Sequence, residues 1–193
     1  AGYWGNFIPQ IPNQFLRRYT KQGEWVLDTF LGSGTTLIES KRLGRNGIGF
    51  ELQQAVADLA ISNINREMNL LSKNVVTEVV VGDSTELDYK KILNDFGVES
   101  VQFVIMHPPY WDIVKFSNDP RDLSNALDID AFIEKMGIIA DKVYEILEND
   151  RYCAIVIGDK YSGGEWIPLG FYTMQEFLRH GFTLKSTIIK NFE

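Results

Sequence analysis

Short apolar runs alternate along this chain with longer amphipathic segments. The runs are rich in Val, Ile and Phe, and several are apolar without interruption, which is typical of strands buried on both faces of a sheet. They predict strands at 25–28, 47–51, 78–83, 101–106, 152–159 and 183–190.

The segments between these runs carry apolar residues at intervals of three and four, the spacing of one helix face. They predict helices at 35–44, from Val56 to Met68, at 129–147 and at 168–181. Gly44 and Gly181 stand where helices commonly stop. Alternating strands and helices predict an α/β fold, a mostly parallel sheet with helices on both faces.

Composition narrows the class of protein. With 193 residues, 45% hydrophobic and 23% charged, the chain has the size and composition of a single globular domain. A single cysteine, Cys153, excludes an internal disulfide, and two histidines argue against a zinc site. No apolar run approaches the ~20 residues of a membrane helix. We therefore expect a cytoplasmic protein with no bound metal and no membrane contact.

Charge gives a mixed indication about partners. The net charge of -7 argues against general attraction to nucleic acid. The residues up to Gly47 are locally basic, and two interpretations stay open there: a basic binding face or ordinary solvated side chains. The residues concerned are Arg17, Arg18, Lys21, Lys41, Arg42 and Arg45.

The first predicted strand runs into the sequence DTFLGSGTT (28–36). In parallel α/β sheets, ligands bind beyond the carboxyl ends of the strands. Gly32 and Gly34 allow a tight turn and close approach of backbone to a ligand, and the following helix offers free N–H groups. Position 37 is Leu, so the third glycine of the dinucleotide fingerprint is absent, which argues against an NAD-dependent dehydrogenase. An ordinary strand-to-helix turn remains the alternative.

Two further acids end the next two strands. Glu51 follows Asp28 by a little over twenty residues, where an acid accepts hydrogen bonds from ribose hydroxyls. Asp83 stands where a carboxylate accepts from an adenine amino group. Because acids at three successive strand ends are hard to explain as helix caps alone, the pattern predicts an adenosine site.

The fourth strand runs into His107-Pro108-Pro109-Tyr110-Trp111. The prolines have fixed φ and no N–H, so the turn is stiff and holds the Pro108 carbonyl in one direction. A neutral His107 offers an accepting ring nitrogen, and Tyr110 offers a flat face. Two acceptors beside an aromatic ring form a receptor for an amino group on a heterocycle.

These motifs together resemble the S-adenosylmethionine-dependent amino-methyltransferases, which methylate adenine N6 or cytosine N4 in DNA. The resemblance implies a Rossmann-like methyltransferase fold, S-adenosylmethionine as cofactor and a flipped-out DNA base as substrate. Residues 7–20 resemble the helix that precedes the glycine loop in this family.

The resemblance also assigns site residues. It places Asp28 and Phe30 in the methionine pocket, with Gly32 and Gly34 in the loop and Thr35 and Thr36 near the cofactor carboxylate. It gives Glu51 to the ribose and Asp83 to the adenine. The substrate amine would be received by His107, Pro108, Pro109 and Tyr110.

His107 departs from the Asp, Asn or Ser that the family carries before Pro-Pro-Tyr. Adenine and cytosine both remain candidate targets. The alternatives are a non-catalytic methyltransferase-like subunit, or an amino-methyltransferase that acts on RNA or on a protein amide. Residues 111–125 form a polar connection after the motif, which either closes over a flipped base or is a solvated loop.

The family resemblance also leads to an expectation about how much of the whole protein these residues represent. We expect residues 1–193 to be one catalytic domain of a longer protein, lacking the final antiparallel strand. No separate target-recognition domain is evident. A further segment or subunit would then recognise the DNA sequence and bind the DNA tightly.

Overall fold

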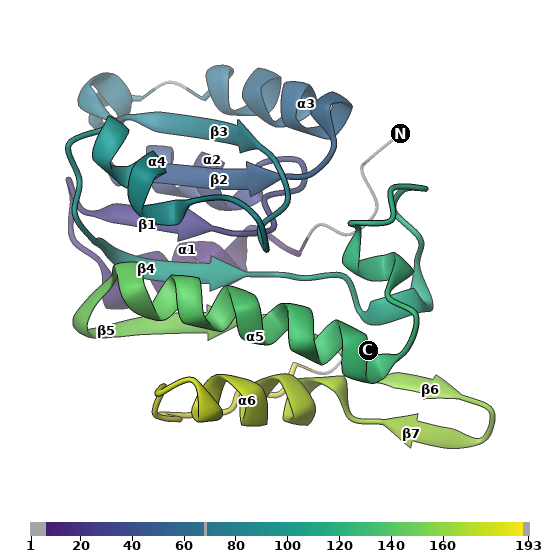
Figure 1. Ribbon diagram of the computed structural model, residues 1–193. Helices are drawn as coiled ribbons and strands as arrows, with labels where there is room; N and C mark the ends of the chain where they lie inside the picture. Colours follow the sequence, from purple (N-terminus) through teal and green to yellow (C-terminus); the bar gives the residue numbers. More distant parts are fainter. Residues whose placement is uncertain (1–6, 68, 191–193) are drawn as a thin grey trace.

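The computed structural model describes residues 7–67 and 69–190. Its main feature is a parallel sheet with the strand order β3-β2-β1-β4-β5 (Figure 1). The strands are β1 Trp25–Asp28, β2 Asn46–Glu51, β3 Thr77–Val81, β4 Val101–Met106 and β5 Leu147–Ile155. The predicted α/β fold with a parallel sheet is confirmed, and β1 and β4 match their predicted bounds.

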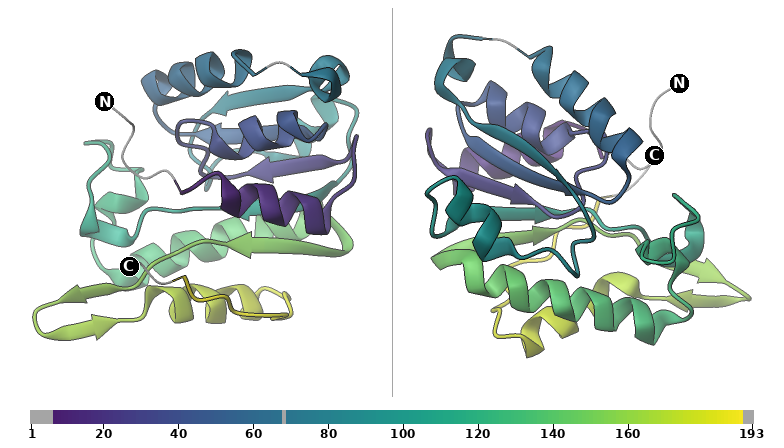
Figure 2. Two further views of the ribbon diagram at one scale, coloured as in Figure 1. Left: turned by 180° about the vertical axis from the view of Figure 1, so that it is seen from behind. Right: turned by 45° about the horizontal axis from the view of Figure 1, so that its top comes forward.

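Helices cover both faces of the sheet (Figures 1 and 2). One face carries the first three, and the other carries α4 and α5, with α6 packed against α5. The helices are α1 Gln10–Tyr19, α2 Thr35–Arg42, α3 Gln54–Asn65, α4 Tyr89–Asp95, α5 Ile129–Ile146 and α6 Leu169–Arg179. Short 3-10 helices span Leu70–Asn74, Trp111–Ile113 and Leu123–Asn125. Helix α3 ends before Met68, which lies outside the described residues.

Strand β4 shows why a mostly apolar run, interrupted only by Gln102, lies at the centre of the sheet. Its side chains alternate between faces, with Phe103 and Ile105 in the cluster that contains Leu16 of α1. Val104 and Met106 belong to the opposite cluster, with the side chains of α5. Since these four side chains are fully buried, each contributes about 1.5–3 kcal/mol to the free energy of unfolding.

Strand β5 begins earlier than predicted. Val101 pairs with Leu147, but Phe103 pairs with Tyr152, so the ladder accommodates extra residues on β5. Asp150 adopts a positive φ of 62° in this bulge. The ladder ends where Met106 pairs with Ile155, which leaves residues 156–159 beyond the sheet.

The predicted sixth strand at 183–190 is wrong. Residues 180–190, the described part of the chain after α6, form no strand, and Ile188 and Ile189 are 72% and 82% exposed. A β-branched run becomes a strand only when it gains a hydrogen-bonded neighbour and a surface to pack on. Within the described residues, β5 pairs with β4 only.

A hairpin that the apolar pattern did not predict follows β5. It consists of β6 Lys160–Ser162 and β7 Glu165–Ile167, antiparallel and separate from the main sheet. Each strand is three residues long, too short for a periodic pattern to be recognised.

The locally basic N-terminal part supplies internal contacts. Arg42 bonds with Glu39 and Glu67, Arg45 is buried and donates to Thr20, and Lys41 donates to a backbone carbonyl of α3. These three cations therefore stabilise the packing of helices and loops. In the described part of the chain, no helix is both long and apolar enough to cross a membrane.

Candidate functional site

The carboxyl ends of β1, β2 and β3 bring the three predicted acids to one edge of the sheet. Asp28 and Glu51 are the last residues of β1 and β2, and Asp83 follows β3 closely. All three are buried, with 1%, 8% and 6% of their surface exposed. Carboxylates are rarely so buried without a partner, so this edge has the character of a binding site.

The glycine loop is bonded to the end of β2. The Leu31 N–H donates to the carbonyl of Phe50 at 2.8 Å, and the Gly32 N–H donates to Oε2 of Glu51 at 3.0 Å. Gly34 caps α2 with a φ of 98°, a conformation that L side chains rarely adopt. The loop therefore presents the N-terminus of α2, starting at Thr35, to the edge where the acids lie.

Asp28 lies at the centre of this arrangement. Its Oδ1 accepts from the Phe30 N–H at 2.9 Å. Burial is the main cause that raises the pKa of Asp28 to about 6, the nearby Glu51 carboxylate raises it further, and the Thr36 hydroxyl and the Phe30 N–H lower it. A cation bound beside Asp28 would favour its charged form.

Glu51 is held by backbone donors on both sides. Oε2 accepts from Gly32, and Oε1 accepts from the Gln53 N–H at 2.9 Å. Burial raises the pKa of Glu51, while these N–H groups oppose the rise. The carboxylate is thus fixed in orientation by the chain before any ligand arrives.

Asp83 is oriented by its own turn. It accepts from both the N–H and the hydroxyl of Thr85, each at 2.8 Å. The neighbouring Ser84 hydroxyl donates to the Thr29 carbonyl, which connects the β3 exit to the glycine loop. Thr29 also has a buried hydroxyl oxygen without a hydrogen-bond partner among the described residues.

The predicted catalytic turn follows β4, the neighbour of β1. His107 Nε2 and Tyr110 Oη lie 2.9 Å apart, and the two rings meet edge to face. Phe7, from the segment before α1, packs its ring edge-on to His107 with centroids 4.9 Å apart. Burial raises the pKa of Tyr110, so this hydroxyl stays neutral.

Gly158, beyond the end of β5, supports the Tyr110 ring. A Cβ at position 158 would lie 2.7 Å from Tyr110 Cε2, far inside contact distance. Only glycine therefore leaves room for the ring in this position. The sequence pattern gave Gly158 no role beyond its place in the strand predicted at 152–159.

Residues 111–125 are ordered and lie beside the cofactor-side acids. Asp122 is buried and accepts from Ser117 and from both the N–H and the hydroxyl of Ser124. The Gln53 side chain donates to the Phe116 carbonyl at 3.3 Å, and the Asp122 charge contributes to the raised pKa of Glu51. The segment is thus more than a solvated loop, and closure over a base stays a prediction.

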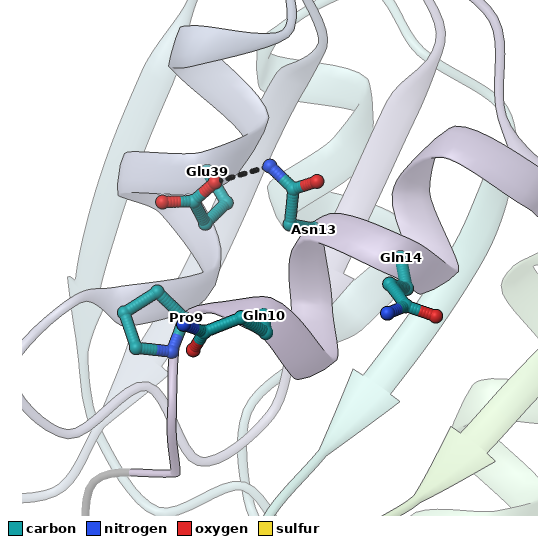
Figure 3. Close-up of a pocket in the computed structure, with 5 residues that line it drawn as sticks. All are labelled: Pro9, Gln10, Asn13, Gln14 and Glu39. Atoms are coloured by element: carbon teal, nitrogen blue, oxygen red, sulfur yellow. Dashed lines mark hydrogen bonds between the residues drawn. The ribbon is translucent and has the colours of Figure 1, made fainter.

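A shallow pocket lies between α1 and α2 and contains no predicted site residue. Figure 3 shows Asn13 of α1 donating to Glu39 of α2, and the Nδ2–Oε2 distance is 2.6 Å. Its lining consists of Pro9, Gln10, Asn13, Gln14 and Glu39. This bond holds α1 against the helix that follows the glycine loop.

Comparison with known families assigns the N-terminal part of this site. Residues 7–62, which contain the glycine loop and both Asp28 and Glu51, match the N6_N4_Mtase family, described as DNA methylase. The matched residues thus resemble the N6/N4 DNA methylases. This resemblance supports the expectation that S-adenosylmethionine is the cofactor. The match ends before β4, so the turn at 107–110 lies outside it.

Two relatives illustrate the range of proteins that resemble this chain. The type II methyltransferase M.MthZI of Methanothermobacter thermautotrophicus is 39% identical over 70 residues, 36% of this chain and 20% of that protein. The tRNA (guanine(10)-N2)-dimethyltransferase of Methanocaldococcus jannaschii is 36% identical over 107 residues, 55% of this chain and 29% of that protein. The chain thus matches less than a third of the length of either relative.

Solved structures agree on the fold. The TehB-like SAM-dependent methyltransferase from Corynebacterium glutamicum superimposes with a TM-score of 0.56 at 13% identity, covering 88% of this chain and 71% of that one. At this identity the likeness establishes a Rossmann-like methyltransferase fold.

The contact between Gly158 and Tyr110 generates a prediction. Gly158→Ala should lower the free energy of unfolding by about 1–3 kcal/mol, because the ring or the strand exit must move. In a Tyr110→Ala background, Gly158→Ala should lower the free energy of unfolding much less, because the Tyr110 ring is no longer present. Urea denaturation of the four proteins in this double-mutant cycle measures the coupling, and equal losses in both backgrounds would contradict the contact.

Proposed function

We propose that this chain transfers the methyl group of S-adenosylmethionine to an exocyclic amino group of a DNA base, adenine N6 or cytosine N4. One observation carries the proposal: the family-matched glycine loop and the His107–Tyr110 turn follow adjacent parallel strands, β1 and β4. The cofactor site and the amine receptor are therefore neighbours at one edge of the sheet.

The residues at this edge suit the cofactor chemically. S-adenosylmethionine carries a cationic ammonium, a carboxylate, two ribose hydroxyls and an adenine amino group. Asp28 and Phe30 would hold the methionine part, the N-terminus of α2 with Gly32, Gly34 and Thr35 would receive the carboxylate, Glu51 the ribose, and Asp83 the adenine. When bound, the cofactor supplies an electrophilic methyl group on sulfur.

The turn after β4 would receive the target amine. The Pro108 carbonyl and a ring nitrogen of His107 accept hydrogen bonds from the amino hydrogens, and the Tyr110 ring stacks on the base. Accepting both hydrogens favours a pyramidal nitrogen and frees its lone pair for direct in-line attack. Pro108, Pro109 and their neighbours would then contribute to catalysis mainly by positioning the amine and by electrostatic stabilisation of the transition state.

The bond between His107 and Tyr110 gives the histidine a defined orientation. Because Tyr110 stays neutral, its oxygen can accept from an Nε2–H, and this bond would set which ring nitrogen of His107 carries the hydrogen. His107 then takes the place that an Asp, Asn or Ser holds in the family pattern. Unlike those residues, an imidazole can become a cation, and a cationic imidazole has no accepting nitrogen.

An RNA amino group is the second candidate substrate. The tRNA relative matches a larger share of this chain, 55%, than the type II relative, 36%. The remaining alternatives are a non-catalytic subunit, motivated by His107, and an enzyme that acts on a protein amide. Methyl transfer from labelled cofactor to unmethylated genomic DNA and to unmodified tRNA, followed by nucleoside analysis, separates DNA and RNA substrates from these two alternatives. N6-methyladenine or N4-methylcytosine supports the proposal, and label only in tRNA, or none, refutes it.

Replacing either His107 or Tyr110 in the proposed amine receptor should stop catalysis and leave cofactor binding unchanged. His107→Ala and Tyr110→Ala should each lower kcat by about 100-fold or more, with the dissociation constant for S-adenosylmethionine nearly unchanged. The activity of the parent protein should also fall at acid pH, because a protonated imidazole has no nitrogen that can accept a hydrogen bond. A flat rate profile from about pH 5.5 to 8 would exclude an accepting His107.

Glu51→Gln should weaken cofactor binding. The amide keeps the shape of Glu51 but loses the charge that strengthens hydrogen bonds from ribose hydroxyls, an expected loss of about tenfold in affinity. Titration calorimetry measures it. Glu67→Gln is the matched control, because Glu67 lies after α3 and pairs with Arg42 of α2. Equal affinity in both variants would remove Glu51 from the ribose site.

Asp28 should make cofactor affinity depend on pH. Burial raises its pKa to about 6 in the free protein, whereas a bound ammonium favours the charged carboxylate and so lowers the pKa. Binding should therefore release a proton, and affinity should rise as pH increases from about 5 to 7. Calorimetry in buffers of different ionisation enthalpy detects the proton. Asp28→Asn should abolish the dependence, and pH-independent affinity in the parent would refute the contact.

A further inference from the structure

The β6–β7 hairpin projects from the same edge of the sheet as the turn after β4. Figure 1 and the right-hand view of Figure 2 show it extending beyond β5, on the side where residues 107–128 also protrude. The hairpin starts at Lys160, two residues after the Gly158 that contacts Tyr110. It therefore stands next to the proposed base receptor.

One face of the hairpin is docked on the protein. Lys160 and Ile167 are cross-strand partners, so their side chains share a face. Ile167 packs on the main hydrophobic cluster. The Lys160 ammonium lies 4.3 Å from the centre of the Trp111 ring and pairs with Asp112. These contacts fix the hairpin to the residues that follow the amine receptor.

The other face presents two aromatic rings to solvent. Tyr161 and Trp166 are also cross-strand partners, with ring centroids 6.4 Å apart, and they are 68% and 65% exposed. The Trp166 indole N–H donates to Asp159 Oδ2 at 3.0 Å, which orients the ring although it is exposed. Asp159 in turn accepts from the Gly170 N–H at the start of α6.

Cross-strand pairing alone does not explain why two aromatic rings lie on the exposed face of the hairpin. Such a pair stabilises a hairpin by covering ring surface, yet about two thirds of each residue stays in water. Oriented, exposed aromatic rings are the common platform on which proteins stack unpaired bases. The local charges argue against binding of DNA phosphates by the hairpin. Lys160 is neutralised by Asp112, and Asp159 and Glu165 are acidic.

We infer that the β6–β7 hairpin is a DNA-contacting element, on which Tyr161 and Trp166 stack bases exposed when the target nucleotide leaves the duplex. The inference rests on the proposed function, since it deepens the substrate side of the same site. A flipped base leaves its partner base unpaired and uncovers the faces of the flanking base pairs, and an aromatic ring can stack on these surfaces. Stacking, unlike phosphate contact, depends little on salt.

The test compares ring-removing with ring-keeping variants. Tyr161→Leu and Trp166→Leu should weaken binding of a duplex with an unpaired target adenine by about 5- to 100-fold, whereas Tyr161→Phe and Trp166→Phe should lose far less. The fold-change should be the same at low and high salt. Tyr144→Leu, an exposed tyrosine near the far end of α5, is the matched control and should bind like the parent.

Fluorescence of Trp166 supplies an independent measurement in the unaltered protein. DNA should quench an emission component that is absent from Trp166→Phe. Equal affinity of the Leu and Phe variants, or no quenching of Trp166, overturns the hairpin proposal. An effect of RNA but not of DNA also overturns it. Methyl transfer by the parent protein tests the proposed function separately. Failure of the hairpin proposal can therefore be distinguished from failure of the proposed function.

Discussion

The parallel pairing of β1 with β4 is the constraint on which the site depends. Val26, Leu27 and Asp28 lie in register with Phe103, Val104 and Ile105, although more than seventy residues of chain separate the strands. Because parallel strands end at the same edge, the loops after β1 and β4 must meet there. The cofactor loop and the proposed amine receptor become neighbours through this pairing, and the helices on both faces bury it.

Around that edge, the chain holds charge and backbone in place before a ligand binds. The Gly32–Glu51 and Leu31–Phe50 hydrogen bonds fasten the glycine loop to β2, and the Ser84 hydroxyl fastens the β3 exit to the loop. Burying acids here has an energetic cost, which the raised pKa values of Asp28 and Glu51 express. A cationic ligand bound beside these acids would offset that cost.

The substrate side is built from more distant parts of the chain. Phe7 contacts His107 from the segment before α1, Gly158 lies against Tyr110 from beyond β5, and Lys160 contacts Trp111 from the hairpin. Trp111 itself has a positive φ of 48°, rare for a residue with a side chain. Three elements therefore converge on the turn after β4, and the strained residue lies where they meet.

The sequence by itself determined the strands that lie in the sheet centre and the acids at their ends. Mostly apolar runs such as 101–106 can satisfy their burial only as central strands, and glycines mark the loop after Asp28. The sequence did not determine the fate of 183–190, whose β-branched residues have no neighbour to pair with, or the start of β5, which a bulge shifted. Nor did it reveal the short β6–β7 hairpin or the role of Gly158. Those features depend on contacts between residues far apart in the chain, and only the tertiary structure brings such residues within contact distance.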